Sequence, residues 1–201
     1  MNKKLKDAIK DRRSYFQLKN SSPISNEKIQ EIIQQVLLHA PSAFNSQSAR
    51  IVLLLGDNHT KLWEITKTEL KKVSQSEEAF RKTEKRVNRS FASGYGTVLF
   101  YEDLSVIKEL EEKYPLFEEN FMLWGHESSA IAQTLTWIGL DSVGLGASLQ
   151  HYNPLIDEAV REEWGINKNW QLKAQMPFGE PVGEPSEKTY VPIEERFVVI
   201  K

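Results

Sequence analysis

The stretch from His126 to Pro154 reads HESSAIAQTLTWIGLDSVGLGASLQHYNP, and the rest of the chain can be arranged around it. Its first half predicts one long helix, because apolar residues recur at helical spacings on most of its sides. These residues are Ala130, Ile131, Ala132, Leu135, Trp137, Ile138 and Leu140. We expect such a helix inside a protein, and its apolar part is shorter than the ~20 residues of a membrane span. The glycines of the second half allow the backbone to turn and to approach a ligand closely.

The composition indicates a globular protein. The chain has 201 residues, with 26 basic and 28 acidic side chains and a net charge of -2. This length suits one domain over residues 1–201, and the balanced charge gives no indication of nucleic acid or membrane as a partner. The chain contains no cysteine, which excludes disulfides and thiolate chemistry. The charged start MNKKLKDAIKDRRS lacks the apolar core of a signal peptide, so we expect a cytoplasmic protein.

Apolar spacing along the chain predicts the other elements. Helices are predicted at residues 5–12, 26–40, 60–92, 104–113 and 154–165. Strands are predicted at residues 51–55, 97–101, 170–176 and 197–200. The last strand is apolar and terminal, so it must pair within the chain or with a partner. A Pro/Gly-rich loop is predicted over residues 177–192, and the order of elements is typical of an α+β or mixed α/β domain with a sheet wrapped by helices.

Two adjacent arginines and a serine, Arg12, Arg13 and Ser14, follow the first predicted helix. Guanidinium groups offer permanent charge and forked donors, which suit an oxyanion such as phosphate. The same residues also fit an ordinary basic helix end, which the helix macrodipole stabilises. Short basic motifs are common, so these residues alone favour the ordinary helix end.

A polar loop, PSAFNSQSAR, follows the second predicted helix at residues 41–50. Its side chains Ser42, Asn45 and Gln47 can pair with a heterocycle that has both donors and acceptors. The alternative is an ordinary turn, because Ser and Asn are common turn residues.

Two further segments carry side chains of one kind, aromatic in the first and basic in the second. The aromatic segment at residues 115–126 either covers a ligand pocket or fills the core, and the basic run KTEKRVNR at residues 82–89 predicts a solvated helix face.

Several motifs are excluded by their context. GLGASL lacks the third glycine of a dinucleotide fingerprint and follows a helix instead of a strand. The chain has no GxxxxGK[ST] loop and no GxSxG elbow. Its four histidines are widely separated and have no HExxH motif beside them, so we expect no metal site. His151 is a candidate general acid, although a lone histidine is more often structural.

Taken in order, these motifs resemble the nitroreductase family of flavoproteins. The resemblance is carried by RRS near the N-terminus, PSAFNSQ after the second helix, GLGASLQHYNP after the central helix, and FGEP with a downstream lysine. The SLQHYNP variant and the short length are similar to the subgroup named after a yeast fatty-acid-repression mutant, which includes bacterial copper-induced nitroreductases. Ser48 and Ala49 replace the Pro-Trp pair usual in the family, which removes part of the wall beside the flavin.

The resemblance implies a fold, a cofactor and a reaction. The fold would be α+β, with a central, mostly antiparallel sheet wrapped by helices and a long buried central helix. The protein would be a homodimer that binds FMN at the subunit interface. It would take electrons from NADH or NADPH and pass them by a ping-pong mechanism to a small flat aromatic acceptor, such as a nitroaromatic compound or a quinone.

The resemblance also implies roles for particular residues. The phosphate and the ribityl chain of FMN would be held by Arg12, Arg13 and Ser14. The flavin would be reached from the neighbouring subunit by Ser42, Asn45 and Gln47. The reactive edge of the ring would be lined by Gln150, His151 and Tyr152. A second phosphate charge would come from Lys188, with Arg196 as a helper. No catalytic residue is assigned, and the proton donor is either His151 or solvent.

Two other functions fit the same residues. A flavin-binding sensor or storage protein would share every motif, without reduction being a turnover step. A plain interaction domain would have no cofactor, and its basic start and polar loop would be surface features. The residue pattern alone predicts a fold, and a fold by itself does not imply a function. The oxidoreductase is therefore favoured by the family resemblance and not by the residue pattern.

Overall fold

The predicted buried strand at residues 97–101 forms the middle of the sheet. The computed structural model describes residues 4–201. In it, strand β3 (Gly96–Asp103) is buried at every residue. Its run of apolar and β-branched side chains is what a strand needs when both of its faces are covered.

The sheet has five strands in the order β1-β5-β3-β2, with β4 also paired to β5. Every pairing is antiparallel, which confirms the predicted α+β fold. The strands beside β3 are β2 (Ala49–Leu55) and β5 (Trp170–Pro181). The short outer strands are β1 (Leu18–Lys19) and β4 (Gly146–Ala147).

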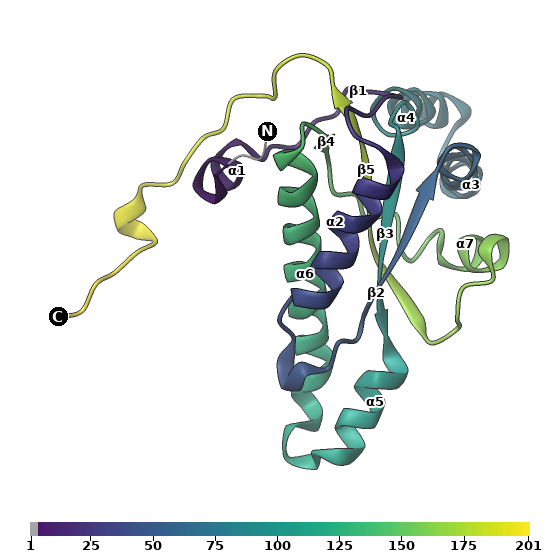
Figure 1. The fold of residues 1–201 in the computed structure, drawn as a ribbon. Coiled ribbons are helices and arrows are strands. Elements are labelled where there is room, and N and C mark those ends of the chain that lie inside the picture. Colours follow the sequence, from purple (N-terminus) through teal and green to yellow (C-terminus); the bar gives the residue numbers. More distant parts are fainter. Residues whose placement is uncertain (1–3) are drawn as a thin grey trace.

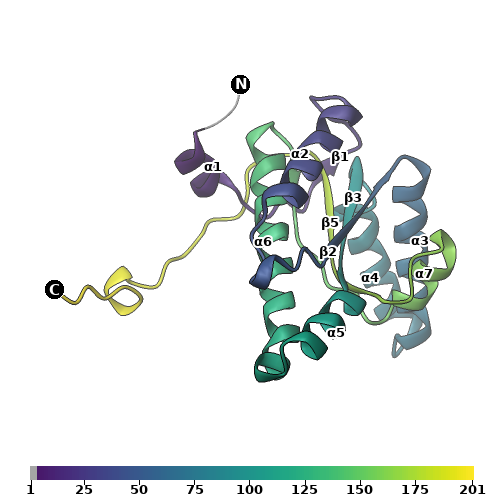
Figure 2. The same cartoon turned by 60° about the horizontal axis from the view of Figure 1, so that its bottom comes forward.

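Helices cover both faces of the sheet (Figures 1 and 2). One face carries α2 (Asn26–His39) and α6 (Glu118–Ser142), and the other carries α3 (Asp57–Val73), α4 (Glu77–Ser90) and α7 (Asp157–Trp164). Side chains alternate along β3, because successive residues of a strand point to opposite faces. Val98 and Phe100 therefore pack under α2 and α6, whereas Leu99 and Tyr101 pack under the other three helices.

The remaining helices lie around this core. Helix α1 is Leu5–Asp11, and α5 is Leu104–Lys113, which continues directly from the end of β3. Short 3-10 turns occur at Ala43–Asn45, Pro115–Phe117 and Ile193–Glu195. Ser25 caps α2, since its side chain accepts a hydrogen bond from the Lys28 N–H at 3.3 Å.

Helix α6 is confirmed as a long helix of 25 residues, and its burial is one-sided. It packs on the sheet with polar positions such as Ser129 and Thr136 as well as with Leu140. Ile131 and Leu135 lie on its outer side, and each keeps 38% of its surface exposed. Some of the apolar side chains that predicted an interior helix therefore stay exposed in the single chain.

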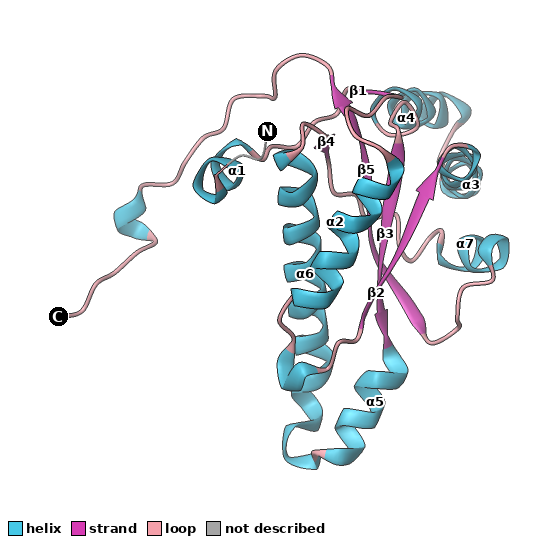
Figure 3. Ribbon diagram, in the orientation of Figure 1, coloured by secondary structure: helices cyan, strands magenta, loops and turns pink. Residues whose placement is uncertain are grey.

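The strand predicted over residues 197–200 is wrong for the single chain. Beyond β5 the tail leaves the sheet, as Figure 3 shows, with one short helical turn in it. Phe197, Val198, Val199 and Ile200 are between 60% and 93% exposed. Because the tail leads away from every edge of its own sheet, only the pairing with a partner remains as a prediction.

Three other boundaries differ from the sequence prediction. Strand β5 continues to Pro181 and so includes the first residues of the predicted loop at 177–192. Helix α7 begins at Asp157, and Pro154 lies in the turn before it. The helical region predicted at residues 60–92 is divided between α3 and α4, with a break at residues 74–76.

One acidic side chain is buried between the sheet and α6. Glu102 on β3 is 0% exposed, and neither of its carboxyl oxygens has a hydrogen-bond partner of good geometry. A Cβ added at Gly125 of α6 would lie 2.9 Å from Glu102 Oε1, so glycine is needed for this close approach. Burial raises the pKa of Glu102, and the nearby Ser48 hydroxyl and the Lys173 charge oppose this effect in part.

We expect Glu102→Gln to stabilise the protein at neutral pH. The folded-state pKa of Glu102 is raised above the unfolded value of 4.5, so the unfolded chain loses this proton first as the pH rises. Above pH 4.5 the free energy of unfolding of the wild type therefore falls below that of the variant. Below pH 4.5 the two free energies become similar. Urea unfolding at pH 3, 5 and 7 measures the difference.

The matched control is Glu109→Gln, at an exposed position on α5. It should change the free energy of unfolding by no more than about 0.5 kcal/mol at any of these pH values. A Glu102→Gln variant that is less stable than the wild type at pH 7 would contradict the buried, unpaired state of this carboxyl group.

Candidate functional site

The basic pair after α1 sends its two side chains to different partners. The guanidinium carbon of Arg12 lies 4.3 Å from the ring centroid of Trp137 on α6. The Nη2 of Arg13 donates a hydrogen bond to the carbonyl oxygen of Ser186, in the tail that follows β5. A cation–π contact thus holds Arg12 against α6, whereas Arg13 lies beside the tail.

The backbone next to this pair joins the glycine turn after α6. Ser14 forms a parallel bridge with Ala147 of β4, and the Tyr15 N–H donates to the Ala147 carbonyl at 3.0 Å. A Cβ added at Gly146 would lie 3.0 Å from both Tyr15 Cγ and Pro181 Cβ. The predicted close backbone approach at this turn is therefore present, and it is made to residues 14–15 and to β5.

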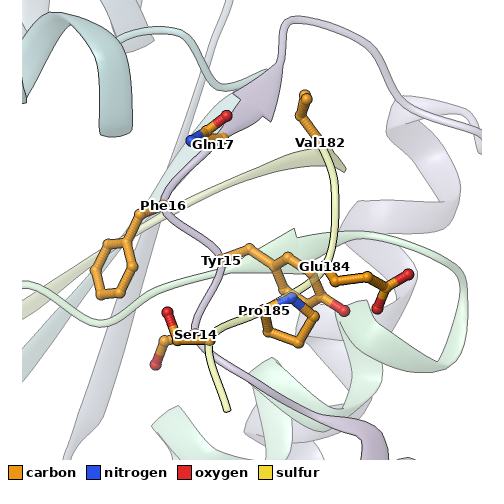
Figure 4. Close-up of a pocket in the computed structure, with 8 residues that line it drawn as sticks. Ser14, Tyr15, Phe16, Gln17, Val182, Glu184 and Pro185 are labelled. Carbon is orange, nitrogen blue, oxygen red and sulfur yellow. The ribbon is translucent and has the colours of Figure 1, made fainter.

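A small cavity lies beside Ser14 (Figure 4). It has a volume of about 100 Å³ and is lined by residues 14–17 and by residues of the tail at 182–186. This is below the ~300–1,000 Å³ of pockets that hold whole organic ligands. The cavity has room for a small group such as a phosphate, and the tail, which includes the acidic Glu184, forms one of its walls.

The segment after β4 is tied to the middle of β5. Gln150 and Gln175 exchange backbone hydrogen bonds of 2.7 and 2.9 Å. The Gln150 side chain donates to the Ser148 hydroxyl at 3.1 Å, and His151 is exposed. The backbone of residues 148–151 is thus held in place, while the His151 side chain is open to solvent.

Tyr152 differs from its two neighbours, because its ring lies in the core between α3, α4 and α7. The ring packs edge-on against Trp63 and Phe91, with centroid distances of 5.9 and 6.1 Å. Burial raises the pKa of its hydroxyl, and the positive charge of Arg86 on α4 opposes that shift. The ring of Tyr152 therefore faces the core, and its backbone N–H donates to Gln175 Oε1 at 2.7 Å.

The polar loop at residues 41–50 is a strained turn. Phe44, Asn45 and Gln47 have positive φ angles of 55°, 52° and 48°. Such angles are uncommon outside glycine, and their strain is often found at functional sites. The Gln47 N–H donates to the Ser42 hydroxyl at 3.0 Å, and the Phe44 ring packs among the aromatic residues of the α5–α6 connection.

Within one chain this loop lies far from the basic pair. Ser42 and Gln47 share a small pocket with Ser128 of α6, whereas Arg12 contacts Trp137 of the same helix. A helix rises about 1.5 Å per residue, so Ser128 and Trp137 lie about 14 Å apart along the axis. The single chain therefore brings Ser14 and Tyr15 to Ala147 and keeps Ser42, Asn45 and Gln47 apart from the basic pair.

The two predicted cations of the tail lie beyond the cavity. Lys188 follows Ser186 closely in the chain, and its Nζ lies 5.3 Å from the ring centroid of Tyr190. Arg196 ends the last 3-10 turn and is exposed. Both side chains are exposed, and in Figure 1 the tail that carries them extends away from the sheet.

Gln175 is a residue of this site that the sequence pattern did not reveal. It is 0% exposed, its Oε1 accepts the Tyr152 N–H at 2.7 Å, and its Nε2 donates to Asn153 Oδ1 at 3.2 Å. Regular alternation in the sequence would put it in phase with Gln171 and Lys173, on a solvent-facing side. The pairing of β5 with β3 shifts register between Phe100 and Tyr101, so Gln175 and Gln171 lie on different faces of the sheet. No local signal separates it from them, because the segment that buries it comes from another part of the chain.

A metal centre is not found in the described part of the chain. Among residues 4–201, no group of three His, Asp or Glu side chains is arranged to hold a metal ion. The ring nitrogens of the buried His59 are hydrogen-bonded to Thr97 Oγ1 at 2.8 Å and to the Ala92 carbonyl oxygen at 3.2 Å, and burial lowers the pKa of the ring.

None of the helices within residues 4–201 combines the length and the apolar character that crossing a membrane requires.

Comparison with known proteins decides the family. Residues 9–180 match the nitroreductase family. This chain belongs to that family. The nitroreductases FRM2 and HBN1 of Saccharomyces cerevisiae are 28% and 34% identical to it, over 92% and 90% of this chain and 92% and 89% of their own lengths. These two yeast relatives confirm the resemblance to the yeast subgroup.

Solved nitroreductase structures have the same fold. Nitroreductase CinD from Lactococcus lactis aligns with a TM-score of 0.89 at 38% identity, over 98% of this chain and 100% of the other. A nitroreductase with bound FMN from Desulfitobacterium hafniense aligns with a TM-score of 0.71 over the full length of both chains. Its identity is 16%, so this second likeness concerns the fold alone.

We expect Gln175→Leu to destabilise this nitroreductase by about 1–3 kcal/mol, because the buried Tyr152 N–H would lose its acceptor. The control is Gln171→Leu on the same strand, where the side chain is exposed and the expected change is within about 0.5 kcal/mol. Urea unfolding of both variants measures the two values. Equal effects at the two positions would show that Gln175 does not hold the residue 150–153 segment.

Proposed function

We propose that this chain is an FMN-dependent NAD(P)H oxidoreductase that reduces nitroaromatic compounds and quinones by a ping-pong mechanism. Membership of the nitroreductase family supports a flavin-dependent oxidoreductase. The observation that carries the proposal is the small cavity lined by Ser14, with Arg13 next to it in the chain and the glycine turn bridged to Ser14 through Ala147. A cytoplasmic location is part of the same proposal.

The residues around the cavity fit the phosphate end of FMN. A phosphate needs charged and hydroxyl donors, and Arg13 and Ser14 supply both beside a cavity of about 100 Å³. Lys188 would add a second charge from the tail. Arg12 contributes less directly, since its guanidinium group is stacked on Trp137 and thereby fixes the start of this segment against α6.

The ligands bound in related structures support the proposed substrates. CinD from Lactococcus lactis has been solved in complex with nicotinic acid, with chloramphenicol and with 4-nitrophenol. The last two compounds carry a nitro group on an aromatic ring, and nicotinic acid contains the pyridine ring of the nicotinamide donors. A protein of the same fold and 38% identity is therefore expected to accept similar flat molecules.

The proposed active form is a homodimer. Ser42, Asn45 and Gln47 are predicted to contact the flavin but lie far from Arg13 in their own chain, so a partner would have to supply them. An exposed apolar surface is available for such an interface, and large exposed patches mark interaction sites. It includes Leu5, Ile9, Ile131, Leu135, Phe197, Val198, Val199 and Ile200.

In the proposed mechanism the protein positions the reactants and needs no nucleophile. Bound FMN would supply reversible two-electron transfer. The backbone of residues 148–152, held by Gln175, would define one edge of the ring site. Reduction of a nitro group to a nitroso group takes two electrons and two protons in total and releases water. When the electrons arrive as a hydride, one of the two protons comes with them, and the exposed His151 or solvent can deliver the other.

We expect Arg13→Ala to weaken FMN binding by about tenfold or more, because a charge-assisted hydrogen bond to phosphate is lost. Fluorescence titration of the apoprotein with FMN measures the affinity. The control is Lys6→Ala, an exposed cation on α1, which should leave the affinity unchanged.

The visible spectrum of the purified wild type tests the whole proposal. Oxidised flavin bands that bleach when NADH or NADPH is added under nitrogen, and return with a nitroaromatic acceptor, are the expected result. Bands that bleach without steady-state turnover would indicate a flavin sensor or storage protein instead. A protein without flavin that ignores added FMN would refute the proposed function.

We expect Leu135→Arg to convert the dimer into monomers, because a charge would replace an apolar side chain at the proposed interface. Sedimentation velocity should then give about half the wild-type mass. Val73→Arg is the control, since Val73 is 60% exposed at the end of α3, on the other side of the sheet. A wild type that sediments as a monomer of 23.2 kDa at micromolar concentration would contradict the dimer.

A further inference from the structure

Arg50, near the start of β2, makes polar contacts in two directions. Its Nη1 donates to the carbonyl oxygen of Gln47 at 2.7 Å and to that of Ala49 at 3.1 Å. Its Nη2 lies 3.0 Å from Oδ2 of Asp103, at the end of β3. A guanidinium group can divide its contacts in this way because its donors form a rigid, planar fork. One side chain therefore joins the strained turn (residues 42–47) to the central strand of the sheet.

Asp103 is a fixed anchor for this arginine. Only 9% of its side chain is exposed, and both of its carboxyl oxygens accept further hydrogen bonds. Its Oδ1 accepts from the Ser105 N–H at 3.1 Å and from the Ser105 hydroxyl at 2.6 Å, and its Oδ2 accepts from Trp170 Nε1 at 3.1 Å. Burial by itself raises the pKa of Asp103, but the Ser105 hydrogen bonds and the Arg50 charge outweigh burial and lower it. The carboxylate therefore stays charged at neutral pH.

The strained turn depends on such support. Phe44, Asn45 and Gln47 have positive φ angles, and a residue other than glycine in this region costs of order 1–3 kcal/mol. One restraint is internal, since the Gln47 N–H donates to the Ser42 hydroxyl at 3.0 Å. The other is Arg50, which binds the carbonyl oxygen of the same residue. Gln47 is thus held on both sides, and removal of Arg50 would release one of them.

The strained turn carries the side chains that the proposed function assigns to the flavin of the partner subunit, Ser42, Asn45 and Gln47. These side chains can meet a rigid ring system only if the turn keeps one shape. When a side chain has to be ordered on binding, the cost is about 0.5–1.5 kcal/mol for each one. Because the charge of Arg50 is paired with Asp103, we expect Arg50 to act on the turn and not on a ligand.

We propose that Arg50, held by Asp103, is a positioning residue that fixes the strained turn in the shape that binds the flavin of the partner subunit. The inference rests on the proposed function, since that function supplies the flavin. Arg50 acts through the Gln47 carbonyl oxygen and does not touch the reacting atoms. Its loss should therefore weaken FMN binding and change the surroundings of the bound ring while the chain still folds.

Arg50→Met is the test variant, and Arg161→Met is its matched control. The two side chains are 29% and 31% exposed and each is paired with a carboxylate, but Arg161 lies on α7, which covers the other face of the sheet from α6. Arg50→Met should weaken FMN binding by about tenfold, because the turn would have to be ordered on binding. It should also change the visible circular dichroism of the bound flavin. Arg161→Met should match the wild type in both measurements.

Arg50→Lys separates the positioning role from a general effect on stability. Lysine keeps the charge that pairs with Asp103, but it lacks the fork that also reaches Gln47. Its free energy of unfolding in urea should be closer to the wild type than that of Arg50→Met, whereas its FMN affinity should stay weakened. Wild-type FMN affinity in either Arg50 variant would overturn the proposal, as would an equal loss of affinity in Arg161→Met.

Hydrogen exchange of the full-length protein without flavin gives a readout that does not depend on turnover. Peptides that cover residues 42–48 should exchange faster in Arg50→Met than in the wild type, because Gln47 loses one restraint. Peptides from α3 should be unchanged. Equal exchange of the turn in the two proteins would overturn the proposal. A wild type that binds no FMN would instead refute the proposed function and the flavin role of Arg50 with it, and hydrogen exchange would still decide whether Arg50 holds the turn.

Discussion

Burial of strand β3 on both faces is the constraint on which the rest of the structure depends. A strand whose side chains alternate between two apolar surfaces requires a cover on each side. Helices α2 and α6 cover one face, and α3, α4 and α7 cover the other. This arrangement places the end of α6 and the turn after it beside β5, where the proposed flavin site lies.

The site is built largely from backbone that is held in place. Gly146 lets β4 approach both Tyr15 and Pro181, and Gln175 holds the chain beyond β4 through the Tyr152 N–H. Such a frame suits a flavoprotein, because the cofactor carries the chemistry and the protein supplies position and charge. The same fold is found in a solved nitroreductase that is 16% identical to this chain.

Much of the fold could be predicted from local patterns. The strand at residues 97–101 and the helices at residues 26–40 and 104–113 were predicted from neighbouring residues, because each depends on interactions a few positions apart. The site was less predictable. Arg12 and Arg13 are equivalent in the sequence, yet one stacks on Trp137 and the other contacts the tail. Both partners lie more than a hundred residues away in the chain.

Local pattern therefore decided where helices and strands form, which residues could bind an anion, and which known family the ordered motifs resemble. Tertiary structure alone decided that Gln175 is buried, that Tyr152 turns its ring into the core, and that Arg50 joins the Gln47 carbonyl oxygen to Asp103. It also left the outer side of α6 and the apolar tail uncovered. The physical reason is that periodicity reports which face a residue occupies, whereas burial and charge pairing depend on the segment that packs against that face.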